Sequence, residues 1–209
     1  MTLPNALTLL RIFFVPLLLA VLLRRDVHLD TPWITLSKEW LALPIFLVAA
    51  LTDLLDGIIA RRRHQVSTLG TLLDPVADKL LISAAFISLV ELGLVQAWMV
   101  VVIVGREFAV SGLRSIAAAE GYTIEASELG KTKMGMQVIA VSLLLVGAHS
   151  PVFLRLGRAA VWLVVLFAVV SAVEYFRKFW RRVDIRFKVR RRRERLLLLR
   201  KQRKDVAAQ

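Results

Sequence analysis

Residues 51–80 read LTDLLDGIIARRRHQVSTLGTLLDPVADKL, and this stretch decides how the chain folds. It places four aspartates, Asp53, Asp56, Asp74 and Asp78, in segments that are otherwise apolar. A carboxylate at the centre of a membrane helix costs about 2.5 to 3.5 kcal/mol, so four of them need compensating partners. Four acids in apolar segments therefore indicate that these side chains have a function.

The composition is typical of a membrane protein. The 209 residues are 57% hydrophobic, and their mean hydropathy is +0.66, which favours a multi-spanning chain that forms one domain. The sequence contains no cysteine, so disulfide frameworks, thiolate metal ligands and thiol nucleophiles are excluded.

A membrane span needs roughly 20 apolar residues, and six segments come close to or exceed this length. They are residues 6–23, 41–60, 73–95, 97–119, 132–149 and 152–176. The sequence shows neither an internal repeat nor a strand-like alternation. We therefore predict an all-α polytopic membrane bundle of six transmembrane helices over residues 1–180, followed by a basic tail over residues 181–209.

The basic residues predict how the chain is oriented. From residue 181 onward the tail carries +10 of the net charge of +13, and cations also follow the second span and precede the fifth. Because short cytoplasmic loops are rich in Lys and Arg, we expect a multi-pass protein of the inner cell membrane with both termini and the aspartates at the cytoplasmic surface. A tail beside headgroups gains about 1 kcal/mol per cation from anionic lipid. Lipid is therefore its expected partner, and nucleic acid is not, because no binding module accompanies the tail.

The spacing of the four aspartates indicates a metal site. Asp53 and Asp56 are three residues apart, and Asp74 and Asp78 are four apart, so each pair projects from one face of a helix. Two consecutive spans joined by a short turn pack antiparallel, which lets the two faces meet. Carboxylate oxygens suit Mg²⁺, Mn²⁺ or Ca²⁺ better than zinc. Four of them can hold two such ions.

The residues beside the acids indicate a phosphate or pyrophosphate site. Gly57 and Ala60 keep the adjacent helix surface low, and Arg61 supplies a bidentate phosphate donor. Each feature has another interpretation: Asp74 before Pro75 suits a helix N-cap, small residues suit helix packing, and buried acids suit an ion or proton transporter. The combination favours the phosphate site.

Three cations predict a second, anion-binding part of the site. Arg106 and Arg114 lie about two turns apart in the fourth span, and Lys131 opens the fifth span across the same loop. Three cations at one depth need an anion. The alternative is that Arg106 pairs with Glu107 or with an aspartate and that Arg114 extends to the membrane surface.

The stretch between Asp53 and Asp78 resembles the signature of the CDP-alcohol phosphatidyltransferases. That signature reads D-x-x-D-G-x-x-A-R, eight residues, then G-x-x-x-D-x-x-x-D, and this chain matches it at every fixed position. The segments LPNALTLLRIFFVP, GREFAVSGLRSIAAAEG and ELGKTKMGMQ are similar to the family members that use sn-glycerol 3-phosphate as acceptor. The resemblance covers about residues 3–140.

The resemblance implies a set of site residues. Asp53, Asp56, Asp74 and Asp78 would hold two ions of Mg²⁺ or Mn²⁺, and Asp78 would also be the general base. The CDP-diacylglycerol pocket would be lined by Asp56, Gly57, Ala60, Arg61 and Gly70. The glycerol phosphate would be bound by Arg106, Arg114 and Lys131, with Lys133 a weaker member. Asn5, Thr8 and Arg11 would border the nucleotide site.

The resemblance also implies the reaction and the partners. The 1-hydroxyl of glycerol 3-phosphate would attack the β-phosphorus of CDP-diacylglycerol, and CMP would leave. The partners would be these two substrates, membrane lipid and a second copy of the chain in a homodimer. Two alternatives remain: another acceptor, namely inositol phosphate, serine or phosphatidylglycerol, and an ion or proton transporter, which has no need of the glycine, alanine and arginine beside the acids.

Overall fold

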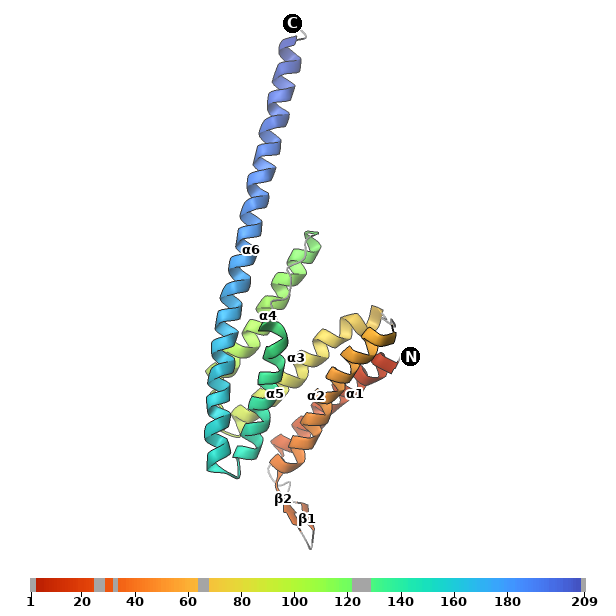
Figure 1. Ribbon diagram of the computed structural model, residues 1–209, viewed down its shortest axis with the longest axis vertical. Helices are drawn as coiled ribbons and strands as arrows, with labels where there is room; N and C mark the ends of the chain where they lie inside the picture. The colour runs from red at the N-terminus through yellow and green to blue at the C-terminus, as the bar shows by residue number, and fades with distance from the viewer. Residues whose placement is uncertain (1–2, 25–28, 32–33, 64–67, 122–128, 208–209) are drawn as a thin grey trace. The chain divides into compact units, whose positions relative to one another are not determined.

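A computed structural model describes the backbone of residues 3–24, 29–31, 34–63, 68–121 and 129–207, and the side chains of residues 8–24, 37–52, 76–121 and 133–182. Figure 1 shows the six helices of this chain. They are α1 Leu3–Leu23, α2 Lys38–Arg63, α3 Thr68–Glu91, α4 Ala97–Ala119, α5 Leu129–Gly147 and α6 Pro151–Ala207. The prediction of a helical fold is confirmed.

Two differences from the prediction concern the segments outside the six spans. Residues between α1 and α2 form an antiparallel pair of short strands, β1 Leu29–Thr31 and β2 Ile34–Leu36. The sequence analysis did not predict this pair, in which the β-branched residues Thr31 and Ile34 face each other. In addition, α6 continues through the basic tail to Ala207, since residues 181–207 contain neither proline nor glycine and are rich in Arg and Leu, which favour helices.

The chain divides into two compact units. Unit 1 comprises Met1–Phe108 and Ala126–Val169, and unit 2 comprises Ala109–Glu125 and Val170–Gln209. Within unit 1, α1 contacts both α2 and α3, and α5 contacts the same two helices. Figure 1 shows α1, α2 and α3 running alongside one another.

The core of unit 1 is made of apolar stripes that recur every three or four residues, as expected for helices that bury one face. On α3 the stripe includes Leu81, Ala85 and Leu89, and on α5 it includes Val141 and Leu144. The other helices of the unit contribute Leu18 and Leu22, Ala42, Phe46 and Ala49, Met99, Val100 and Ile103, and Val161, Val164 and Val165.

The buried face of α1 changes character along the helix. Leu18 and Leu22 are enclosed by apolar neighbours, whereas Thr8 and Arg11, two to four turns earlier, are enclosed and polar. Helix α5 shows the same gradient from Lys133 to the apolar residues that follow. Because buried polar groups need partners, these helices define a polar end of unit 1.

Every helix of unit 1 also exposes large apolar side chains. Between 46% and 69% of the surface of each of the following is exposed: Phe13, Val48, Ile87, Val101, Ile139 and Leu166. In length and composition, Pro151–Arg182 is sufficient to cross a membrane, while Thr8–Leu23 and Lys133–Gly147 are shorter apolar helices, in a search confined to the described residues. The six spans remain a prediction.

Candidate functional site

The four aspartates of the signature lie on two helices that contact each other. Asp53 and Asp56 belong to α2, and Asp74 and Asp78 belong to α3. The side chain of Asp78 is described. Nine other predicted site residues have side chains outside the described ones: Asn5, Asp53, Asp56, Gly57, Ala60, Arg61, Gly70, Asp74 and Lys131. Their roles remain predictions.

Asp78 forms an ion pair with Arg11, which comes from α1, 67 residues earlier in the chain. The Arg11 side chain is fully enclosed, whereas 32% of the Asp78 side chain is exposed. A buried guanidinium needs a charged or strongly polar partner, because an uncompensated charge in the interior is costly. The structure thus brings a residue predicted to border the site against the predicted general base. The open side of Asp78 leaves its carboxylate accessible to a proton or a cation.

A second cluster of charges joins α4 to α5. Arg106 donates a hydrogen bond from its guanidinium to Oε1 of Glu107 at 2.9 Å, and the ammonium of Lys133 pairs with the same oxygen. The side chains of both cations are at least 92% buried. Lys133 also experiences the positive charges of Arg106 and of Lys79. Glu107 is thus shared by two buried cations, and guanidinium and ammonium groups are the side chains that bind an anion such as a phosphate group.

This cluster differs in detail from the predicted one. Arg106 pairs with Glu107, as the alternative interpretation of the sequence had it, yet Glu107 is shared between two buried cations and orients both. Lys133, which ranked below Lys131 as a ligand, is the buried lysine among the described residues of α5. The prediction missed Lys79. Its position directly after Asp78 was the available signal.

Sequence reasoning also passed over Gln137, one turn after Lys133 on the buried face of α5. Only 3% of its surface is exposed, and within the described part of the chain its amide nitrogen has no hydrogen-bond partner. Buried polar groups rarely remain without one, which calls for an explanation. A lysine and a glutamine four residues apart in an apolar helix was the signal that could have revealed it. Its amide can donate to a ligand.

Arg114 belongs to unit 2. Its guanidinium donates to the hydroxyl of Tyr175 at 2.6 Å and lies 5.3 Å from the centroid of the same ring, within the range of a cation–π contact. Tyr175 is 3% exposed, so this contact gives Arg114 a fixed support. The predicted role of Arg114 in binding glycerol phosphate remains a prediction.

The chain matches a known family over most of its length. Residues 1–171 match the sequence model of the family described as CDP-alcohol phosphatidyltransferase. The CDP-diacylglycerol–glycerol-3-phosphate 3-phosphatidyltransferase of Bacillus subtilis (strain 168) is 42% identical over 190 residues, which cover 85% of this chain and 95% of the relative. A relative of the same name in Rickettsia bellii is 33% identical over 178 residues, with 84% and 93% covered. The chain belongs to the CDP-alcohol phosphatidyltransferase family.

A solved structure shares the fold. The crystal structure of Mycobacterium tuberculosis phosphatidylinositol phosphate synthase with CDP-DAG bound matches with a TM-score of 0.60 and 19% sequence identity, over 86% of this chain and 87% of that chain. At this identity the likeness shows the fold alone. The predicted family fold is thus confirmed by both comparisons.

Proposed function

We propose that this chain transfers the phosphatidyl group of CDP-diacylglycerol to sn-glycerol 3-phosphate and releases CMP. The observation that carries the proposal is that one unit contains both the Arg11–Asp78 ion pair and the cluster of Arg106, Glu107 and Lys133. The matching signature and the names of two relatives support the same reaction.

The donor set fits a pair of divalent ions. Asp53, Asp56, Asp74 and Asp78 offer hard oxygen donors from two contacting helices, and the described member of the set, Asp78, is partly exposed. We propose that they hold two ions of Mg²⁺ or Mn²⁺. When bound, such ions neutralise and align a pyrophosphate for displacement.

The residues of the chain then have distinct tasks. Asp78 takes the proton of the glycerol 1-hydroxyl, whose oxygen attacks the β-phosphorus, and Arg11 holds the carboxylate in place. The cationic cluster binds the phosphate group of the acceptor. The proposal also assigns the CDP pocket to Asp56, Gly57, Ala60, Arg61 and Gly70, its border to Asn5, Thr8 and Arg11, and further acceptor contacts to Lys131 and Arg114.

The proposed setting is the inner cell membrane, crossed six times, with both termini and the active site cytoplasmic. Exposed large apolar side chains on each of the six helices support it, because lipid can cover such side chains in a membrane protein. The polar ends of α1 and α5 then face the cytoplasm, where glycerol phosphate arrives. The basic tail lies against anionic lipid. A homodimer is proposed by resemblance to the family.

The proposal is tested by measuring CMP release from CDP-diacylglycerol by the purified full chain in detergent. Mg²⁺ or Mn²⁺ is supplied, and glycerol 3-phosphate, inositol phosphate, serine and phosphatidylglycerol are offered one at a time. We expect release with glycerol 3-phosphate alone, and none after chelation of the metal. Release with a different acceptor alone would reject the proposed substrate. No release with any acceptor would reject the transferase and leave the transporter interpretation.

Arg114→Ala is expected to raise the KM for glycerol 3-phosphate about tenfold or more and to change kcat much less, because it removes a contact to the bound acceptor. Tyr175→Phe is the matched control, since it removes the hydroxyl that supports Arg114 and keeps the guanidinium. We expect this control to raise KM only a few-fold. An unchanged KM in Arg114→Ala would favour the alternative interpretation, in which the Arg114 side chain extends to the membrane surface and does not bind the acceptor.

A further inference from the structure

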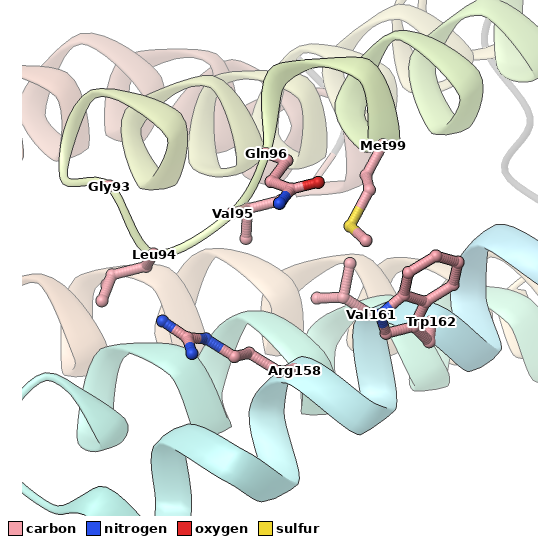
Figure 2. Close-up of a pocket in the computed structure, with 8 residues that line it drawn as sticks. All are labelled: Gly93, Leu94, Val95, Gln96, Met99, Arg158, Val161 and Trp162. Carbon is pink, nitrogen blue, oxygen red and sulfur yellow. The ribbon is translucent and has the colours of Figure 1, made fainter.

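Unit 1 contains a pocket of about 280 Å³ between the α3–α4 turn and α6. Its lining comprises Gly93, Leu94, Val95, Gln96, Met99, Arg158, Val161 and Trp162. Figure 2 shows Arg158 reaching from α6 toward the turn, while Met99 lies across the pocket from Val161 and Trp162. None of these residues is a predicted member of the transferase site.

The backbone fixes both walls of the pocket. Helix α3 ends in a Schellman motif: Gly93 has a φ of +69°, its N–H donates to the carbonyl of Val90 at 2.9 Å, and the N–H of Leu94 donates to the carbonyl of Leu89 at 3.0 Å. On the other wall, Gly157 lets α6 approach α5 closely, because a Cβ there would lie 3.1 Å from the backbone nitrogen of Leu144. Arg158, the next residue, is thereby held at one position along α5.

The pocket lies far from Asp78. Both belong to α3 or its end, and the 13 residues from Asp78 to Glu91 correspond to about 20 Å of helix. In the proposed six-span topology, on which this step of the inference rests, the pocket opens at the membrane surface opposite the aspartates. The pocket is therefore accessible to lipids of the leaflet opposite the aspartates.

The polar groups of the pocket suit a phosphate. Arg158 is the one charged residue among its lining residues, and a guanidinium binds phosphate oxygens through two parallel hydrogen bonds. The side-chain oxygen Oε1 of Gln96 accepts a hydrogen bond from Nε1 of Trp98 at 2.6 Å. This bond turns the amide nitrogen of Gln96 toward the pocket, as Figure 2 shows, where it can serve as a second donor.

The rim of the pocket suits a lipid rather than a free phosphate. Trp98 and Trp162 meet edge to face with their ring centroids 5.5 Å apart, and about half of each side chain is exposed. Tryptophans of this kind mark the level of the headgroups in membrane proteins. Beyond them, Val101 on α4 and Leu166 on α6 are also exposed and can contact acyl chains.

We propose that this pocket binds the phosphodiester headgroup of an anionic phospholipid from the leaflet opposite the aspartates, through Arg158 and Gln96. The acyl chains of that lipid lie along α4 and α6. The pocket is thus a lipid site separate from the one that CDP-diacylglycerol occupies.

The proposal is tested by native mass spectrometry of the full chain in detergent, with phosphatidylglycerol and phosphatidylcholine of identical acyl chains as probes. We expect the wild-type chain to retain one phosphatidylglycerol in preference to phosphatidylcholine. Arg158→Gln should weaken that retention about tenfold or more, because it removes a charge-assisted bidentate contact. Arg155→Gln is the matched control: it removes the same charge one turn earlier on α6, outside the pocket lining, and should retain the lipid.

Several outcomes would overturn the proposal. Equal losses in the two arginine variants would assign the effect to overall surface charge, and equal retention of both lipids by the wild type would rule out a headgroup site. Displacement of the lipid by millimolar inorganic phosphate would assign the pocket to a free anion. Gln96→Met, expected to weaken retention about threefold, provides a second test if Arg158→Gln fails to fold. The measurement uses neither CDP-diacylglycerol nor metal, so no transfer can occur, and the Arg158 and Arg155 variants report on the pocket whether or not CMP release is observed.

Discussion

Asp78→Asn is expected to lower CMP release by about 10² to 10⁴-fold, the range that a general base contributes. The amide keeps the shape of the side chain and can still face Arg11, but it cannot take a proton from the attacking hydroxyl. Because the carboxylate is also a proposed metal ligand, its loss would weaken metal binding as well. We therefore expect a loss of CMP release in the upper part of this range. The measurement is kcat at saturating acceptor and metal, with the variant and the wild type compared at equal amounts of monodisperse protein.

The control for this variant is Glu91→Gln. It makes the same acid-to-amide change on the same helix, at the exposed far end, and should leave kcat unchanged. Activity of Asp78→Asn close to that of the wild type would rule out this residue as the base. An equal loss in both variants would trace the effect to α3 as a whole.

Glu107→Gln is expected to destabilise the folded chain by about 3 to 5 kcal/mol, the cost of removing one partner from a buried ion pair. In the wild type, Arg106 and Lys133 share one carboxylate oxygen of Glu107. The substitution replaces this carboxylate with a neutral amide, while both cations stay buried. Glycerol 3-phosphate should restore part of the loss, because its phosphate supplies the missing negative charge. Thermal unfolding in detergent, with and without this ligand, measures both effects.

Glu174→Gln is the matched control for this second experiment. Glu174 pairs with Lys178 at 2.6 Å in an exposed i,i+4 arrangement on α6, and such pairs contribute about 0.3 to 0.5 kcal/mol. We therefore expect little change in unfolding and no added effect of ligand. Equal unfolding of the two variants would show that the Glu107 cluster is not a buried charge centre. Failure of glycerol 3-phosphate to stabilise Glu107→Gln would remove the cluster from the acceptor site.

The positions of the helices could be read from the sequence because long apolar segments leave few other solutions. The predicted spans 97–119 and 132–149 correspond to α4, Ala97–Ala119, and to α5, Leu129–Gly147. The family was equally accessible, since the signature fixes residue types at fixed spacing. The β1–β2 pair was missed because its strands are three residues long, too short for any periodicity to appear.

Partnerships between distant residues could not be predicted in the same way. Arg11 and Asp78 meet because α1 packs against α3, and no local pattern links residues that far apart in sequence. The burial of Lys133 likewise depends on which face of α5 turns inward. The sequence of one helix does not show that face, because it is set by packing against other helices.

The enclosed guanidinium of Arg11 changes how the amino-terminal helix should be regarded. A shortened chain that began at α2 would still contain the whole aspartate signature, and any search by motif would count it as intact. It would nevertheless lack the group that holds Asp78. The first helix is therefore no dispensable anchor: fusions, deletions or alternative translation starts that remove it would yield a protein that looks complete by its signature and is chemically unfinished.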